Sequence, residues 1–239
     1  MALLTLVRHG QASFLADNYD KLSPLGERQA HILGEYWIAH GVHFDQIYFG
    51  PAERQIRTGQ IACAVFAQAG LPCPEPVILP DFDEYAGIEV IRTFLPELIE
   101  KHQDIREMEA AFRSAADKNE AARTYDRLFQ RITRMWAAEE LDSADVEPWA
   151  HFCARVARGV SEVRERSSRN GRIALFTSGG VIAATARIAL DLDPLKTLDL
   201  SWTSRNASFS EFLFSGDRFS LAGFNHLPHL TDGGLITYR

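Results

Sequence analysis

The sequence of 239 residues is poor in cysteine and contains no long hydrophobic run. Its three cysteines are far apart and form no CxxC pair, which argues against a disulfide framework and against a zinc motif. We therefore expect buried thiols in a reducing compartment, at Cys63, Cys73 and Cys153. No apolar stretch approaches the length of a membrane span, and the first residues lack the pattern of a signal peptide. These absences predict a cytoplasmic protein without membrane contact.

Positive charge is also scarce. Lys and Arg number 25 against 32 Asp and Glu, which gives a formal net charge of −7. Nucleic acids and anionic membranes are bound by basic surfaces, so this balance argues against both as partners. Any positively charged site must be local. The hydrophobic share of 46% and the charged share of 24% are typical of a globular protein with a substantial core.

Short apolar runs alternate with helical patterns at both ends of the chain. Ser23 and Pro24 form a typical helix start, with Ser as the N-cap and Pro at the first helical position. Repeated strand–helix units predict an α/β three-layer sandwich, with a mostly parallel central sheet flanked by helices. The predicted strands are Ala2–Val7, Gln46–Phe49, Val77–Leu79, the run RIALFT from Arg172, and two strands of a hairpin around Ser215-Gly216-Asp217.

Between about 92 and 168 only helical patterns occur. An apolar stripe with helical spacing is formed by Tyr125, Leu128, Phe129, Ile132 and Trp136. The charges between these positions are interpreted as a solvated helix face. We interpret the segment as a helical insertion over the ligand-binding end of the sheet, so that residues 1–239 form a single domain.

The tripeptide Arg8-His9-Gly10 follows the first predicted strand, and ligands of parallel sheets bind beyond the carboxyl ends of their strands. A guanidinium group holds two phosphate oxygens at once, and a neutral imidazole is a competent nucleophile. Glycine lets the backbone come close to a bound anion. By itself, however, the tripeptide is equally well explained as Arg and His in a surface loop.

Several further motifs give the tripeptide a context. The string LVRHGQASFLADNYDKLSPLGERQA resembles the opening signature of the histidine phosphatase superfamily, which has the phosphoglycerate mutase-like fold. The string GPAERQIRTGQIA is similar to the Ser-Pro-Leu-x-Arg-Ala-x-x-Thr-Ala motif of that family, with Gly50 in place of the usual Ser. LPDFDEYAGIEV looks like its acidic segment, and RNASFSEF and GFNHLPHL look like its closing strands.

The resemblance implies a phosphohistidine mechanism that needs neither a metal nor a cofactor. His9 would attack the phosphorus atom, and Arg8 and Arg54 would bind the phosphoryl oxygens. Glu84 would protonate the departing oxygen and then help deprotonate the attacking water. Asp81 is the competing assignment for that last role. The implied substrate is a phosphorylated small molecule.

The sequence departs from the family at the end of the fourth strand. The family usually has Ser/Thr-His-Gly there, and Ser178 stands in the place of that second histidine, between Thr177 and Gly179. A hydroxyl donates a hydrogen bond but carries no charge, and losing a well-placed donor typically costs about 2.7–4 kcal/mol in the transition state. We expect the backbone N–H groups of Gly179 and Gly180, at a helix N-terminus, to restore part of this stabilisation.

A second basic group is the other way to compensate. His226 is the candidate for this compensating role, although it is equally interpreted as an ordinary packed or surface histidine. His229 matches a common structural ending in the family.

The leading hypothesis is therefore a phosphohydrolase of the acid phosphatase type, with activity reduced by Ser178. The alternative is a phospholigand-binding or regulatory protein of phosphatase ancestry with weak catalysis. A phosphotransferase of the phosphoglycerate mutase type ranks third. Such an enzyme needs a closed pocket that protects the phosphoenzyme from water, and the missing histidine makes such a pocket harder to form.

Overall fold

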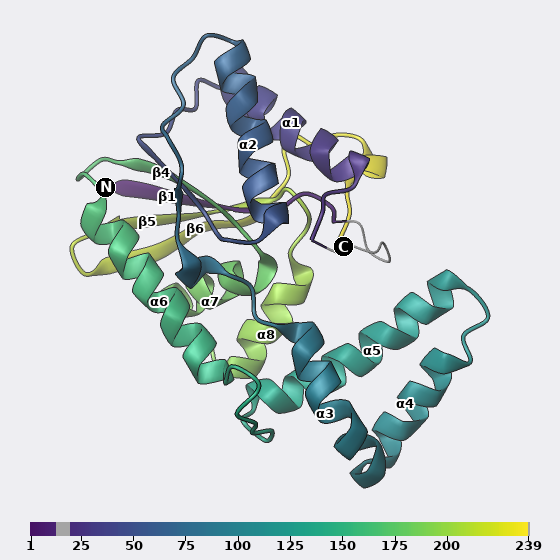
Figure 1. Ribbon diagram of the computed structural model, residues 1–239. Coiled ribbons are helices and arrows are strands. Elements are labelled where there is room, and N and C mark those ends of the chain that lie inside the picture. The colour runs from purple at the N-terminus through teal and green to yellow at the C-terminus, as the bar shows by residue number, and fades with distance from the viewer. Residues whose placement is uncertain (13–19, 239) are drawn as a thin grey trace. The chain divides into compact units, whose positions relative to one another are not determined.

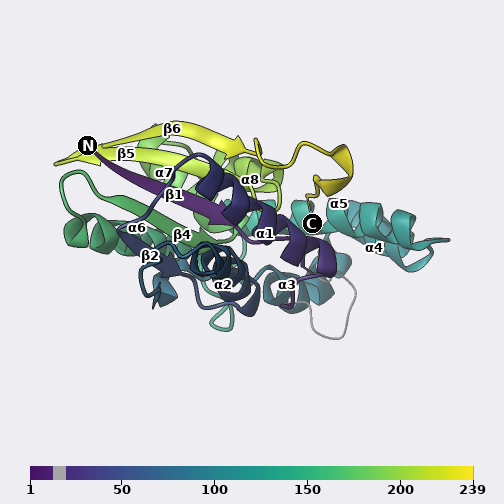
Figure 2. The same ribbon diagram turned by 90° about the horizontal axis from the view of Figure 1, so that it is seen from above.

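Six strands form one mixed sheet in the order β3-β2-β4-β1-β5-β6. Its strands β4, β1, β5 and β6 are labelled in Figure 1. Strands β3, β2, β4 and β1 run parallel, whereas β5 is antiparallel to β1 and β6 is antiparallel to β5. Figure 2 shows the spatial order of the strands in the sheet from β6 to β2. This confirms the predicted α/β class with a mostly parallel sheet. The strands are β1 (Ala2–Arg8), β2 (Gln46–Phe49), β3 (Val77–Ile78), β4 (Arg172–Thr177), β5 (Phe209–Ser215) and β6 (Arg218–His226).

The computed structural model describes residues 1–12 and 20–238. The chain divides into two units, which we call the sheet unit (Met1–Glu84 with Arg155–Arg239) and the helical unit (Tyr85–Ala154). The sheet unit contains α1 (Pro24–Ala39), α2 (Glu53–Gln68), α7 (Gly179–Leu190), α8 (Pro194–Thr203) and the second part of α6 (Trp149–Arg166). Sequence analysis did not predict α8.

The first helix begins as its sequence predicts. The Ser23 hydroxyl accepts a hydrogen bond from the Gly26 N–H at 3.0 Å, and Pro24 occupies the first turn. Gly41 follows the helix with φ of +63°, a conformation that glycine adopts without strain. The third strand is shorter than predicted, because β3 ends at Ile78, one residue before Leu79.

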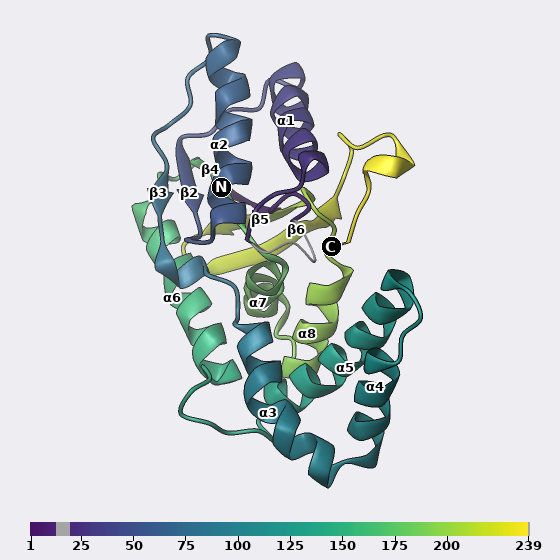
Figure 3. The ribbon, with the colours of Figure 1, turned by 45° about the vertical axis from the view of Figure 1, so that its right-hand side comes forward.

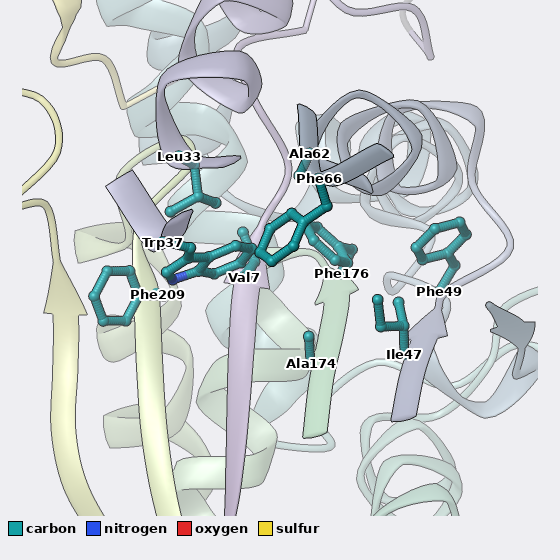
Figure 4. Close-up of a cluster of buried hydrophobic side chains, with 10 residues drawn as sticks. All are labelled: Val7, Leu33, Trp37, Ile47, Phe49, Ala62, Phe66, Ala174, Phe176 and Phe209. Atoms are coloured by element: carbon teal, nitrogen blue, oxygen red, sulfur yellow. The ribbon is translucent and has the colours of Figure 1, made fainter. Parts of the chain in front are cut away.

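Helices α1 and α2 cover one face of the sheet, and α7 lies on the other (Figures 1 and 3). The first of these layers is filled by aromatic and aliphatic side chains (Figure 4). Trp37 meets Phe176 edge to face, with ring centroids 6.1 Å apart. The cluster consists of Val7, Leu33, Trp37, Ile47, Phe49, Ala62, Phe66, Ala174, Phe176 and Phe209. Its burial anchors the parallel strands whose ends carry the candidate site.

The helical unit contains α3 (Gly87–Lys101), α4 (Gln103–Arg113), α5 (Lys118–Ala137) and the start of α6. Helices α4 and α5 lie side by side (Figure 3), and the predicted apolar stripe of α5 buries Leu128, Ile132 and Trp136. The unit begins earlier than the predicted insertion, because α3 already starts at Gly87. That residues 1–239 form one domain with an insertion stays a prediction.

The cysteines are half-buried rather than buried as predicted, and all three, which lie within the described residues, are free thiols. Burial, and a hydrogen bond with Cys73, raise the pKa of the Cys63 thiol. Within residues 1–12 and 20–238, no helix combines the length and the apolar character that crossing a bilayer requires.

Candidate active site

Three loops leave the same edge of the sheet, at the carboxyl ends of β1, β2 and β4. Arg8 pairs with Thr177 and Phe49 pairs with Phe176, so these strands end at nearly the same level. The His9 N–H continues the ladder to the Thr177 carbonyl at 2.9 Å. Because β4 lies between β2 and β1, Ser178 follows the central strand and His9 follows one neighbour.

His9 is the buried imidazole of this edge, with 5% of the residue exposed. Its Nδ1 lies 2.7 Å from the Gly10 carbonyl oxygen. A carbonyl only accepts hydrogen bonds, so Nδ1 carries the proton and Nε2 carries the lone pair. Burial, and then the charges of Arg54 and Arg8, hold the pKa of His9 well below its usual value. The ring is therefore neutral at neutral pH, the form in which imidazole is a nucleophile.

The loop that carries His9 is fixed from two sides. The Asn206 side-chain amide and the Ala207 N–H both donate to the His9 carbonyl at 3.2 Å. The Thr58 hydroxyl accepts from the Gly10 N–H at 3.0 Å and donates to the Arg54 carbonyl at 2.7 Å. Asn206 and Thr58 were not among the site residues predicted from the sequence. The feature that could have identified them is that they lie within the motifs RNASFSEF and GPAERQIRTGQIA quoted above.

Gly10 packs closely against the start of α1. A Cβ at Gly10 would lie 2.4 Å from the Gly26 carbonyl oxygen, and a Cβ at Gly26 would lie 2.1 Å from the Gln11 carbonyl oxygen. Both positions therefore exclude any side chain, because the loop after β1 packs against the first turn of α1. Close approach of two chain segments is thus one reason for a glycine at position 10, and the approach of a bound anion to it stays a prediction.

The charges of the two predicted arginines add to burial in lowering the pKa of His9. The Arg8 Nη1 donates to the backbone carbonyls of Tyr238, at 2.8 Å, and of Ser204. The Arg54 Nη1 pairs with the Asp20 carboxylate at 2.5 Å. Asp20, which sequence analysis missed, also accepts the Glu53 N–H at 2.8 Å and so holds the N-terminus of α2.

Of the two candidate carboxylates, Glu84 faces the strand ends. Its Oε2 accepts the Gly180 N–H at 2.9 Å, in the first turn of α7. The Asp81 carboxylate instead pairs with Arg158 at 3.2 Å. The Gly180 amide predicted for the phosphoryl group is thus taken by Glu84, because a carboxylate is well placed at a helix N-terminus. Gly179 lies beside Arg8, since a Cβ there would be 3.7 Å from Arg8 Nε.

Ser178 is 1% exposed, and its Oγ accepts a hydrogen bond from Gln55 Nε2 at 2.8 Å. The candidate compensating base, His226, is exposed and packs against Phe209 with ring centroids 5.6 Å apart. His229 is buried, and burial lowers its pKa to about 4. In the described part of the chain, no three or more His, Cys, Asp or Glu side chains are grouped to hold a metal ion.

The chain matches the family model of the histidine phosphatase superfamily (branch 1) in two segments, residues 4–89 and 85–227. A search of curated protein sequences finds no match. Solved structures show the same fold at low sequence identity. The phosphoserine phosphatase of Entamoeba histolytica, in complex with 3-phosphoglyceric acid, is 16% identical with a TM-score of 0.63, covering 96% of this chain and 100% of that one.

Two further structures resemble the chain. The mycobacterial glucosyl-3-phosphoglycerate phosphatase is 18% identical, with a TM-score of 0.59 and coverage of 94% of this chain and 99% of that one. A phosphoglycerate mutase from Bacillus anthracis is 16% identical, with a TM-score of 0.61 and coverage of 96% and 95%. At these identities the likeness establishes the fold.

Proposed function

Since the chain belongs to the histidine phosphatase superfamily, we propose that it is a phosphohydrolase that cleaves a phosphomonoester through a phosphohistidine intermediate on His9. One observation carries the proposal: the Nδ1–H of His9 is bound to the Gly10 carbonyl at 2.7 Å, which leaves the lone pair on Nε2. This nucleophile lies in the field of Arg8 and Arg54, which attracts a phosphoryl group.

In the first step, the lone pair of His9 Nε2 forms a bond to phosphorus as the bond from phosphorus to the leaving oxygen breaks. The ring gains a positive charge, which the Gly10 carbonyl stabilises through the Nδ1–H. Arg8 and Arg54 bind the phosphoryl oxygens, whose charge the arginines offset in the transition state. The negative charge of the incoming phosphate favours the protonated form of Glu84, whose carboxylate takes up a proton as the substrate binds. The carboxyl then gives this proton to the leaving oxygen, so that an alcohol departs.

In the second step, water attacks the phosphorus atom and the bond to Nε2 breaks, which returns the electron pair to His9. The Glu84 carboxylate takes a proton from the water and regains its starting state. In this proposal Ser178 donates a hydrogen bond to the phosphoryl group in place of a second histidine. The reaction uses a phosphorylated small molecule and no cofactor, because the arginines supply the positive charge. The proposed location is the cytoplasm, where cysteines persist as thiols.

The proposal is tested with p-nitrophenyl phosphate as substrate. We expect His9→Asn to lower kcat by at least about a thousandfold, because the nucleophile is lost. Acid-labile phosphate is expected on the wild-type protein after rapid quenching and not on His9→Asn. His226→Asn is the matched control, since that ring is exposed and packs against Phe209. Turnover retained in His9→Asn, or no turnover and no trapped phosphate in the folded wild type, would contradict the proposal.

A phospholigand-binding protein with weak catalysis is the second candidate. It is favoured by the contacts of the two arginines, because Arg8 already binds backbone carbonyls and Arg54 already binds the Asp20 carboxylate. A phosphate group must compete with these oxygens. On this alternative, inorganic phosphate raises the unfolding temperature while hydrolysis stays near the uncatalysed rate. Rapid turnover of p-nitrophenyl phosphate would remove it.

A further inference from the structure

Gln55, in the first turn of α2, is a fully buried amide that reaches the end of β4. Its Oε1 accepts the Ala52 N–H at 3.1 Å. Its Nε2 donates to the Phe82 carbonyl at 3.4 Å and to Ser178 Oγ at 2.8 Å. A backbone N–H only donates and a carbonyl only accepts, so these two partners fix which end of the amide faces Ser178. The end that faces the hydroxyl is the donor.

The contact with Gln55 determines what the Ser178 hydroxyl can do. Since Nε2 has no lone pair to offer, Ser178 Oγ is the acceptor in this bond and its own proton must point elsewhere. Ser178 occupies the N-cap position of α7, where a serine normally accepts an amide of the first turn. With that turn, all of which the structure describes, the side chain makes no such bond, and Glu84 binds the Gly180 N–H instead. The Ser178 hydroxyl therefore does not cap α7.

The sheet order places Gln55 and the His9 loop on opposite sides of Ser178. Gln55 belongs to the segment that follows β2, His9 follows β1, and β4 lies between these two strands. Gln55 thus approaches Ser178 from the β2 side, and the side toward β1 is the one on which the His9 loop begins. Donation toward that side would reach a phosphoryl group attached to His9.

Gly50 makes room for the amide. A Cβ at Gly50 would lie 2.1 Å from Gln55 Oε1 and 2.5 Å from the Phe82 carbonyl oxygen. Any side chain at this position would displace Gln55 from its place. In the family motif quoted above, the corresponding residues are Ser at position 50 and Ala at position 55. The contacts join Gly50, Gln55 and Ser178 in one arrangement, although Gln55 and Ser178 are 123 residues apart.

We propose that Gln55 is a positioning residue, which holds the Ser178 hydroxyl as a hydrogen-bond donor to a phosphoryl oxygen, and that Gly50 admits it. The inference rests on the proposed function, because it assigns the task of the second histidine to a serine and a glutamine together. Its distinctive consequence is that Gln55 acts only through Ser178.

The test is a double-mutant cycle on kcat for p-nitrophenyl phosphate. Ser178→Ala removes the donor and should lower kcat by about tenfold to a hundredfold. Gln55→Met keeps the length of the side chain and removes its N–H, and we expect a loss in the same range. The double variant should be within about twofold of Ser178→Ala, because nothing is left to orient. Losses that multiply would overturn the inference.

Gln29→Met is the matched control. Gln29 is equally buried, and its Nε2 donates to the Leu235 carbonyl at 2.7 Å. Any effect of this variant should multiply with that of Ser178→Ala, because its bonds run to other residues.

Gln55→Glu provides a second readout. Once ionised, the carboxylate that this substitution introduces accepts the Ser178 proton and so turns the donor away from the phosphoryl group. The kcat of Gln55→Glu should therefore fall as this carboxyl ionises with rising pH. The fall should be absent in Gln55→Met, which has no such carboxyl, and in Ser178→Ala/Gln55→Glu, whose carboxylate has no hydroxyl to turn. A pH profile of Gln55→Glu that matches that of Gln55→Met would count against the positioning role.

Binding of inorganic phosphate, measured by calorimetry on the same variants, separates this inference from the proposed function. If the wild type shows no turnover, the proposed function fails, and non-additive losses of phosphate affinity in the cycle still support the role of Gln55. If the wild type turns over and the effects of Gln55→Met and Ser178→Ala multiply, the proposed function stands and the positioning role fails. An unchanged kcat in folded Gln55→Met also overturns it.

Discussion

The sheet unit and the helical unit bury different kinds of side chain. Among residues 85–154, all of which the structure describes, Thr133 is the one buried side chain of polar or charged type, and its hydroxyl donates to the Phe129 carbonyl at 2.7 Å. The sheet unit buries many, and those of the strand-end site are His9, Gln55, Thr58, Ser178 and Asn206. Burying a polar group is costly unless it is hydrogen-bonded. Among the described residues, polar burial is therefore mainly a property of the sheet unit, which carries the candidate site.

The largest expected effect tests whether the two units are separable. Trp136 is 2% exposed, its Nε1 donates to the Glu147 carbonyl at 3.0 Å, and its ring packs on Trp149. Trp136→Ala should destabilise the helical unit by about 3–5 kcal/mol. Because the candidate site residues belong to the sheet unit, inorganic phosphate affinity should change less than about threefold. Urea unfolding followed by circular dichroism, and calorimetry, measure the two quantities.

The control for Trp136→Ala is Arg123→Ala, at an exposed position of the same helix, which should change stability by no more than about 0.5 kcal/mol. Phosphate affinity that collapses together with the stability of the helical unit would show that the candidate site depends on both units.

Lowering the pH should reduce the stability of the sheet unit more than that of the helical unit. The pKa of His229 is about 4 in the folded chain, below its ordinary value of 6.5. The unfolded chain binds the proton first, so the stability is complete above pH 6.5 and is lost as the pH falls toward 4. The loss amounts to about 2–3 kcal/mol. The helical unit contains His102 and His151, and neither is buried.

The measurement is hydrogen exchange of the two units between about pH 7 and pH 4.5, the range in which the unfolded chain takes up the proton first. His229→Phe keeps the ring packing on Phe209 and should flatten the pH dependence of the sheet unit, whereas His151→Phe should leave it unchanged. His9, whose pKa is also lowered, adds a dependence of the same sign that both variants retain. An equal acid response of both units would argue against this contrast.

The smallest expected effect compares one ion pair in each unit. Asp20 pairs with Arg54 in the sheet unit, and Asp104 pairs with Arg131 at 2.8 Å in the helical unit. Asp20→Asn removes an anion that competes for Arg54, so inorganic phosphate should bind roughly two- to fivefold more tightly. Asp104→Asn should leave that affinity unchanged. Weaker phosphate binding in Asp20→Asn would show that the carboxylate positions the arginine instead of competing for it.

The sequence was sufficient to predict β1, the start of α1 at Ser23-Pro24, the hairpin of β5 and β6, and the apolar stripe of α5. These features depend on short-range patterns: capping residues, alternation, and helical periodicity. The motif order also identified the family. It singled out Arg8, His9 and Arg54, and the charges of the two arginines lower the pKa of His9. Helix α8 was missed because it is short and its start, Asp193-Pro194, is also a common turn signal.

Neighbouring residues thus carry enough information to predict the strands, the start of α1 and the apolar stripe of α5. Long-range packing is what brings Glu84 to the Gly180 amide, Asp20 to Arg54, and Gln55 to Ser178 through the space left by Gly50. The physical reason is the sheet order, which inserts β4 between β2 and β1 and so joins Gln55 to a side chain 123 residues away. Such contacts leave no periodic or local pattern in the chain.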